Sequence, residues 1–293
     1  MAKFSRHSLL KWLIPPLLLA AILVWAAVLI TPDDNLHVSF LDVGQGDAIL
    51  IQTPNHQNIL IDGGPSPQII DLELGEKLPF WDRTMDLMIS TQPQADHITG
   101  LVEVLQRYKV KQVLEPGVSY NSCVYQKWLK LIEEKEIKHY VAKAEQEIDL
   151  GSGIKIEVLN PPEEFFKGTS ADVDNNGVVL RLSWGEVSFL FTADIRWEGE
   201  FELIKQRANL RSTVLKVAHH GSKTSTMPQF LAVVDPQITV ISVGANNTFG
   251  HPNPEVVERL RERLGEDSIY LTSENGTVEF ITDGEKLWVK AER

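Results

Sequence analysis

The sequence predicts an α/β domain in which β-sheets are covered by helices, and three observations support this fold class. Residues 37–43 alternate between apolar and polar side chains, as half-buried strands do. Residues 87–89 are continuously apolar, as in strands buried on both faces. Helical patterns lie between such strands, for example at 124–135 and 254–264. The chain has 293 residues, of which 43% are hydrophobic, and this suits one domain of about 250 residues with an appendage.

The N-terminal segment contains a long apolar run. Residues 12–30 include 19 residues without a charged side chain, close to the roughly 20 that span a bilayer, and basic residues precede them within 1–11. The sequence therefore predicts an uncleaved transmembrane anchor over 12–30, a cytoplasmic flank at 1–11, a linker at 31–36 and an extracytoplasmic domain at 37–293. A cleaved signal, which would give a secreted protein, and a buried soluble helix are the alternatives.

The elements of the domain follow one another without an internal repeat. Strands are expected at residues 37–43, 48–51, 58–62, 87–89, 110–114, 139–142, 154–159, 178–182, 187–191, 214–217, 238–242, 269–271 and 277–280. Helices are expected from about 101, at 124–135, at 197–207 and at 254–264. Glycines at 63 and 64 and prolines at 161 and 162 end two of the strands, while Pro254 lies in the first turn of its helix.

The charge and cysteine content exclude some functions. The formal net charge is −12, and tight non-specific binding of duplex DNA normally requires a basic surface. A nuclease still needs only a local basic path. The single cysteine, Cys123, is expected to be a packed or surface thiol, because it has neither a disulfide partner nor the clustering of a zinc–thiolate site.

The polar loop at residues 90–100 is the strongest candidate for a functional site. It follows the buried strand at 87–89 and precedes a helix, so its side chains should lie at the carboxyl end of a sheet, where α/β folds bind ligands. Asp96 and His97 stand next to each other in this loop, and both side chains bind metals.

Three further stretches carry a resemblance to a known family. Residues 40–48 read Phe-Leu-Asp-Val-Gly-Gln-Gly-Asp-Ala, residues 215–225 contain His-His-Gly-Ser-Lys, and residues 242–247 read Ser-Val-Gly-Ala-Asn-Asn. With the loop at 90–100, they resemble the hydrolase domain of ComEC-type DNA-uptake proteins, within the metallo-β-lactamase superfamily. Bacterial phosphorylcholine esterases carry a similar domain. The resemblance, which covers residues 37–280, implies an αββα sandwich with a metal site at the edge between two sheets.

The resemblance also implies a set of metal ligands. Asp96, His97, Asp194 and His220 match the positions that hold the second metal of the family, and His219 matches a neighbour that contacts the substrate phosphate. Two carboxylates and two imidazoles suit zinc or manganese.

The sequence departs from the family pattern at the first metal. The family loop reads His-x-His-x-Asp-His, but Gln92 and Gln94 replace its first two histidines. A glutamine offers only a neutral amide oxygen, so the first site is expected to be empty or very weak and one divalent ion to remain. One ion cannot hold both the attacking and the leaving oxygen, as a two-metal site does.

Other polar residues are candidates for the same rim. Asp62 is expected to orient a ligand or a water, and Asp42 and Asp47 are expected to act likewise. The residues expected to contact substrate or to assist catalysis are Ser222, Lys223, Asn246 and His251. Some candidates have a purely structural alternative: Asp42 and Asp62 as turn residues, His219 with His220 as a packed pair, and His251 as a loop anchor.

The sequence thus favours a membrane-anchored, extracytoplasmic, metal-dependent hydrolase of phosphoester or phosphodiester bonds, with DNA as a candidate substrate. Its catalytic residues would be Asp62, Asp96, His219 and Lys223. The alternative is an inactive domain of the same fold that binds a ligand or partner, and a true lactamase is less favoured than either. With one predicted membrane segment the chain cannot itself form a transport pore, so a separate membrane channel protein is an expected partner.

Overall fold

The computed structural model describes the backbone of residues 6–30 and 33–293, and side chains at 12–23, at 25 and from 33 onward. The chain divides into two compact units, Met1–Asp33 and Asp34–Arg293. The first contains helix α1 (Arg6–Ile30). Among the described residues, no helix is both long and apolar enough to cross a membrane. Although the segment is helical as expected, a transmembrane helix over 12–30 is thus not supported. Residues 1–5, 31 and 32 and the side chains at 6–11, 24 and 26–30 lie outside the described part of the chain, and with them most of the predicted flank.

The second unit contains a mixed sheet of eight described strands, in the order β17-β16-β1-β2-β3-β5-β7-β8. The strands are β1 (Leu36–Phe40), β2 (Ile49–Gln52), β3 (Asn58–Ile61), β5 (Leu87–Ile89), β7 (Gln112–Glu115), β8 (Lys138–Val141), β16 (Val278–Thr282) and β17 (Leu287–Ala291). β3, β5, β7 and β8 are parallel to their neighbours in this series. β1 pairs with β16 in the register Phe40 to Val278, which joins the start of the domain to its end.

A second sheet has seven described strands, in the order β15-β14-β13-β12-β11-β10-β9. They are β9 (Glu147–Gly151), β10 (Ile154–Asn160), β11 (Val179–Trp184), β12 (Val187–Phe191), β13 (Val214–Lys216), β14 (Ile238–Ile241) and β15 (Ile269–Leu271). β12 to β15 are parallel, so their carboxyl ends meet at one edge. Two short strands, β4 (Thr84–Met85) and β6 (Lys109–Val110), form a separate parallel pair.

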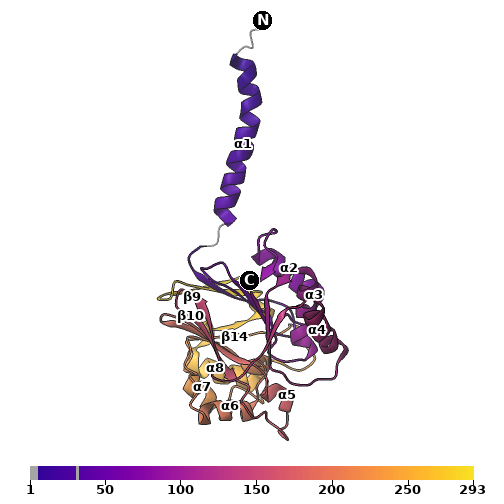
Figure 1. Cartoon of the computed structure of the whole chain (residues 1–293). Helices are drawn as coiled ribbons and strands as arrows, with labels where there is room; N and C mark the ends of the chain where they lie inside the picture. The colour runs from indigo at the N-terminus through magenta and orange to yellow at the C-terminus, as the bar shows by residue number, and fades with distance from the viewer. Residues whose placement is uncertain (1–5, 31–32) are drawn as a thin grey trace. The chain divides into compact units, whose positions relative to one another are not determined.

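Helices cover the outer face of each sheet (Figure 1). α2 (Pro67–Lys77), α3 (Ala95–Arg107) and α4 (Cys123–Glu134) pack on the first sheet, and α6 (Trp197–Lys205), α7 (Pro228–Val234) and α8 (Pro254–Leu264) pack on the second. Shorter elements are α5 (Asp172–Asn175), α9 (Thr272–Asn275) and the 3₁₀ turns η1 (Ala218–Gly221) and η2 (Glu266–Ser268). The result is the αββα sandwich that the sequence analysis expects.

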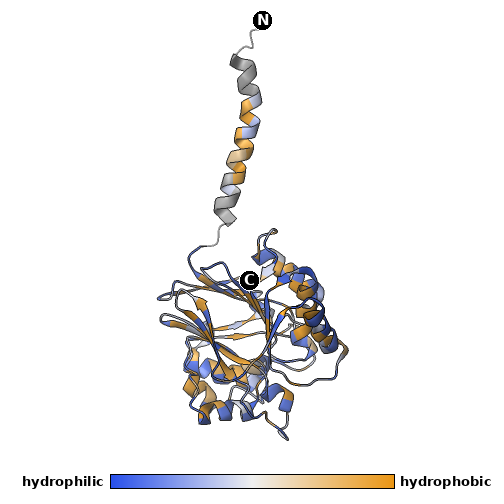
Figure 2. Cartoon of the chain, in the orientation of Figure 1, coloured by the Kyte–Doolittle hydropathy of each residue, from blue (hydrophilic) through white to orange (hydrophobic). Residues whose placement is uncertain are grey.

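The main hydrophobic core lies between the two sheets, as the apolar strands in Figure 2 indicate. Phe40 and Phe280 of the first sheet pack edge to face with their ring centroids 5.7 Å apart, and Phe189 and Phe191 of the second sheet join them. α3 presents buried residues at positions 98, 101, 102 and 105 to its sheet, the spacing of one helical face. This packing fixes α3, and with it the metal-binding pair at its start.

Candidate metal centre

Four candidate ligands lie where parallel strands end. Asp96 and His97 occupy the first turn of α3, after β5, and Asp194 follows β12. His220 lies in η1, directly after β13. The N-terminal turn of a helix favours a carboxylate, because the helix dipole is positive there, and Asp96 occupies that position.

The four side chains converge on one point. One donor atom from each of Asp96, His97, Asp194 and His220 lies within 4.8 Å of the others. The Asp194 Oδ2 atom is 3.4 Å from the Nε2 atoms of both histidines, and the Asp96 Oδ2 atom is 3.8 Å from each. Ligands at about 2.0–2.2 Å from a tetrahedral zinc ion are separated by about 3.3–3.6 Å. The two separations that involve Asp194 lie in this range and the two that involve Asp96 are slightly longer, so the four donors need only a small inward shift to hold one tetrahedral ion.

The His97 ring is held from behind by Asp62, which follows β3. The Asp62 Oδ2 atom lies 2.8 Å from His97 Nδ1, and the Asp62 carboxylate also accepts from the backbone N–H and hydroxyl of Thr91. This bond turns His97 Nε2 toward the other ligands, as carboxylates behind metal-binding histidines do. Burial by itself would lower the pKa of His97, but Asp96, Asp62 and Asp194 raise it well above its usual value.

Gln92 lies against the atom of His97 that would bind metal. The two Nε2 atoms are 2.6 Å apart, and Gln92 Oε1 has no hydrogen-bond partner among the described residues. The family loop would have an imidazole at this position. In this chain the Gln92 amide hydrogen-bonds to His97 Nε2 instead of offering an imidazole to a first metal ion. This hydrogen bond must break when His97 Nε2 binds a metal ion.

A buried lysine, Lys216, and a buried aspartate, Asp47, lie next to the candidate ligand Asp194. Lys216, at the end of β13, forms an ion pair with Asp47 and donates to the carbonyl of Ala193 at 2.9 Å, and its Nζ lies 3.7 Å from Asp194 Oδ1. Burial tends to lower the pKa of Lys216, but Asp47 and Asp194 raise it, so the ammonium stays charged. Among the described side chains, the carboxylates of Asp47, Asp62 and Asp194 all act on this one lysine. Such an excess favours a bound cation.

The backbone is strained at several of these positions. Asp62, Ala193, His219 and His220 all have positive φ angles, of 57°, 49°, 51° and 53°. Side chains other than glycine rarely adopt this region, and each instance costs of order 1–3 kcal/mol. The strain is concentrated where the ligands turn inward, which is typical of functional sites.

His219 and His251 lie beside the cluster at its open side. Their ring centroids are 5.5 Å apart, and His219 is 6.3 Å from His220. Burial lowers the pKa of both histidines, so both are neutral near pH 7. The Nδ1 atoms of both have no hydrogen-bond partner in the described part of the chain.

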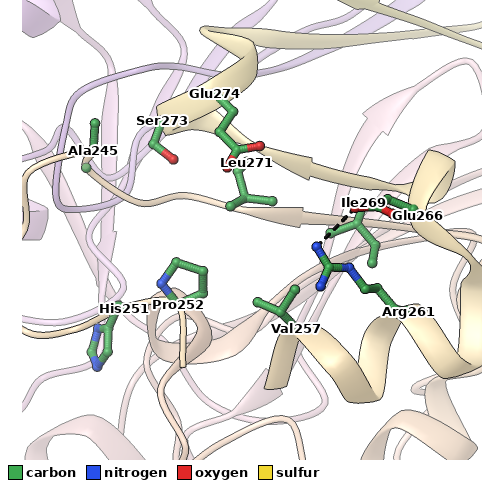
Figure 3. A pocket seen from close by; sticks show the side chains of 11 residues that line it. Ala245, His251, Pro252, Val257, Arg261, Glu266, Ile269, Leu271, Ser273 and Glu274 are labelled. Carbon is green, nitrogen blue, oxygen red and sulfur yellow. Dashed lines mark hydrogen bonds and ion pairs between the residues drawn. The ribbon is translucent and has the colours of Figure 1, made fainter. Parts of the chain in front are cut away.

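A pocket of about 340 Å³ has His251 at one end of its lining (Figure 3). Its far wall includes Arg261, which pairs with Glu266 at 3.0 Å, and Pro252 separates it from the histidine ring. None of the four candidate ligands lines this pocket.

Several predicted site residues lie apart from the cluster. Ser222 is buried and its hydroxyl bonds with that of Thr224, while Lys223 and Asn246 are exposed. Among the described residues, no hydrogen bond or ion pair joins these three side chains to the cluster. Their predicted substrate contacts stay predictions.

Asp42 does not act like Asp62. Its carboxylate pairs with Arg293 at 2.6 Å and accepts from the backbone of Gly44 at 3.4 Å, so it anchors the C-terminal strand and the turn. Of the three aspartates expected to support the ligands, the structure places Asp47 and Asp62 at the centre and Asp42 away from it.

Sequence reasoning missed three charged residues near the centre. Lys216 could have been noticed, because a lysine interrupts an otherwise apolar strand. Asp174 and Arg196, which form an ion pair at 2.8 Å, carry no such signal, since both lie in polar segments. The pair contacts Gln94, whose Nε2 donates to Asp174 Oδ1 at 2.7 Å.

Comparison with known proteins places this fold and centre in a family. The model of the metallo-β-lactamase superfamily matches residues 41–245, more than half of the chain. The chain belongs to the metallo-β-lactamase superfamily. The match includes the loop that bears Asp96 and His97 and extends beyond Asp194 and His220.

Relatives of this metallo-β-lactamase domain include competence proteins. ComE operon protein 3 of Bacillus subtilis is 29% identical over 264 residues, and Recombination protein 2 of Haemophilus influenzae is 30% identical over 226 residues. These matches cover 83% and 76% of this chain but only 32% and 26% of the relatives. The chain thus spans about a third or less of the curated relatives' length.

Solved structures confirm the fold. The metallo-β-lactamase fold protein YhfI of Bacillus subtilis is 12% identical with a TM-score of 0.53, covering 87% of this chain and all of that protein. Zinc-bound PqqB of Methylobacterium extorquens is 9% identical with a TM-score of 0.51, covering 82% of this chain and 99% of PqqB. At such identities the likeness concerns the fold alone.

Proposed function

We propose that this protein is a metal-dependent hydrolase of phosphoester or phosphodiester bonds that uses one divalent ion, zinc or manganese. The observation that carries the proposal is the convergence of Asp96, His97, Asp194 and His220 at distances that suit a tetrahedral ion. DNA is a candidate substrate, because the relatives include proteins named for competence and recombination. An anionic phosphoester is the class of substrate that a cationic ion at this rim would attract.

In this proposal each residue has a distinct task. A divalent ion supplies a Lewis acid for a phosphoryl oxygen and lowers the pKa of a water. Asp62 keeps the proton of neutral His97 on Nδ1, which leaves Nε2 free to bind the ion. Lys216 holds Asp47 and Asp194 in place. His219 and His251 are neutral imidazoles with free Nδ1 atoms, which suits hydrogen bonding to substrate and acceptance of a proton from the attacking water.

The deciding experiment measures metal in the full chain. The purified protein is dialysed and its zinc and manganese are quantified by elemental mass spectrometry, beside the Asp194→Ala variant. We expect about one ion per chain, lost in the variant, followed by hydrolysis of bis-nitrophenyl phosphate or DNA by the loaded protein. If neither protein holds metal after incubation with zinc or manganese, the hydrolase proposal fails.

A second candidate function is binding without catalysis. Gln92 and Gln94 favour it, because both amides already bond within the protein, to His97 and Asp174. A chain that holds its ion but turns over neither bis-nitrophenyl phosphate nor DNA would support this candidate.

The location of the domain stays a prediction of the sequence. It rests on the uncharged run at 12–30 and the basic residues before it. Cell fractionation of the full chain, with protease added to intact cells, tests whether the domain lies outside the cytoplasm. Co-purification from the same cells tests the predicted association with a membrane channel protein.

A further inference from the structure

Arg196 presents an unused group beside the candidate metal centre. It follows the ligand Asp194 by two residues, and its side chain is 26% exposed. The Nε and Nη2 atoms both face Asp174 Oδ2, at 2.9 and 2.8 Å. The Nη1 atom makes no hydrogen bond within the described residues, so one edge of the guanidinium is paired and the other is available.

Asp174 connects this guanidinium to the position of the missing first metal. Its other oxygen, Oδ1, accepts from Gln94, which stands where the family loop has an imidazole. The nearby charge of Asp194 adds to burial in raising the pKa of Asp174, while His219 and Arg196 counteract this. Asp174, Arg196, His219 and Asp194 thus form one electrostatic group around that position.

The backbone around Arg196 is held rigidly. Its N–H donates to Asn175 Oδ1 at 2.9 Å, and the next N–H, of Trp197, donates to the carbonyl of Thr224 at 2.9 Å. Arg196 is also the N-cap of α6, where a cation opposes the helix dipole. Helix stability therefore does not explain an arginine at this position, and its backbone is held two residues from the candidate ligand Asp194.

The charge of the centre shows why such a group matters for a phosphoester. The carboxylates of Asp47, Asp62, Asp96 and Asp194 offset the charges of Lys216 and of one divalent ion, so the attraction of the ion for an anionic substrate is weakened. A two-metal site has a second ion to bind the substrate oxygen. An arginine donates strong, directed hydrogen bonds to phosphate and needs no coordination sphere.

We propose that Arg196 is a substrate-binding residue whose free Nη1 edge binds a non-bridging oxygen of the phosphoester, in place of the missing first ion. The neighbouring His219, with its free Nδ1, completes the anion-binding side of the centre. The proposal rests on the proposed phosphoester substrate. In it, Arg196 supplies the positive charge that a first metal ion would supply in a two-metal site.

The experiment measures binding of inorganic phosphate and metal content on the same full-chain samples. The wild type, Arg196→Gln, Arg196→Lys and the control Arg211→Gln are loaded with metal, dialysed and titrated with phosphate by calorimetry. Arg211 is a suitable control because it is an exposed arginine that also pairs with an aspartate, Asp235, at 3.5 Å. Unfolding temperatures measured in parallel report on any structural role.

We expect Arg196→Gln to weaken phosphate binding about tenfold or more, since a charged hydrogen-bond donor is lost. Arg196→Lys should recover part of the affinity, because the charge remains while the planar fork is lost. Metal content should stay unchanged in both, and Arg211→Gln should behave like the wild type. If Arg196→Gln does not fold, a several-fold loss in Arg196→Lys carries the test.

The outcome that overturns the inference is an unchanged phosphate affinity in both Arg196 variants, whatever happens to their unfolding temperatures. If the wild type holds metal, that outcome leaves the hydrolase proposal standing. If the wild type holds no metal, the hydrolase proposal fails separately. In that case the phosphate titration of the metal-free proteins tests the role of Arg196. A weaker phosphate affinity in Arg196→Gln than in the wild type supports that role, and equal affinities or no binding in either protein contradict it.

Discussion

Asp62 and Asp42 show how two aspartates in similar sequence settings acquire different tasks. Both follow an apolar strand and precede a glycine turn, so the residues themselves do not distinguish them. In the fold, Asp62 is fully buried against His97, whereas Asp42 pairs with Arg293 near the chain end. The distinction arises because β3 runs beside β5, which brings Asp62 to the start of α3.

We predict that Asp62→Asn weakens metal binding about 10- to 100-fold, as losses behind a metal-binding histidine typically do. Asparagine tolerates the positive φ of 57° at this position, so the backbone should persist. The matched control, Asp42→Asn, should bind metal like the wild type. Competition with a metal chelator gives both affinities, and equal affinities in the two variants would contradict the role of Asp62.

At the scale of elements, the centre depends on how closely the glycine turn after β3 approaches α3. Gly63 N donates to His97 O at 2.7 Å, and Gly100 N donates to Gly64 O at 3.0 Å. A Cβ atom on Gly100 would lie 1.9 Å from Gly63 O, so no other residue fits there without movement. This contact sets the separation between Asp62 and His97.

We predict that Gly100→Ala lowers the free energy of unfolding by about 1–3 kcal/mol, as overpacking does, and also weakens metal binding. The control is Gly75→Ala in α2, where an added Cβ meets no described atom within 4 Å. That variant should stabilise the protein by about 0.5–1 kcal/mol, because alanine is favoured over glycine within a helix. Urea unfolding and chelator competition measure both effects; intact metal binding in Gly100→Ala would show that the contact does not position the ligands.

At the scale of the whole molecule, Glu200 joins α6 to the segment that leads from η1 to α7. Its carboxylate accepts from the backbone N–H of Met227 at 2.9 Å and from that of Thr226. The side chain is almost completely buried, and burial raises the pKa of Glu200 to about 7 despite these bonds.

We predict that Glu200 makes the protein less stable as pH rises from about 4.5 to about 7. The folded chain binds the Glu200 proton more tightly than the unfolded chain, so this stabilisation is complete below the unfolded pKa of 4.5 and lost as pH rises through about 7. The shift corresponds to about 3 kcal/mol. Urea unfolding at pH 5 and pH 8 measures the difference between wild type and Glu200→Gln, which should have a flatter pH dependence.

Glu202→Gln, on the same helix, is the control for Glu200. Lys205 lowers the pKa of Glu202, the opposite direction, and its side chain is partly exposed, so the variant should retain the wild-type fall between pH 5 and pH 8. A pH dependence that is equally steep in Glu200→Gln would contradict the assignment.

Local patterns predicted many elements well, and the exceptions have physical causes. α8 begins at Pro254 and ends at Leu264 as expected, because Asn253 caps it and proline suits its first turn. β1 ends at Phe40, before the predicted residue 43, since Val43 N–H donates to the carbonyl of Leu41 in a tight turn. α2 was not predicted: Ser66 caps it, but only Ile70 and Leu74 are buried, so its apolar pattern is weak.

The sequence by itself determined the fold class, and its resemblance to a family predicted four candidate ligands that the fold brings together. The spacing of apolar residues reflects which face of a strand or helix is buried, so it predicts the elements. The loops that carry the candidate ligands follow strands that short apolar runs predict. Only the tertiary structure decided that Asp62 supports His97, that Lys216 is buried beneath Asp194, and that Arg196 reaches Gln94 through Asp174. These contacts join residues from different loops, and their distances depend on how the two sheets and their helices pack. Side-chain chemistry is encoded locally, whereas the geometry that lets it act together is a property of the whole fold.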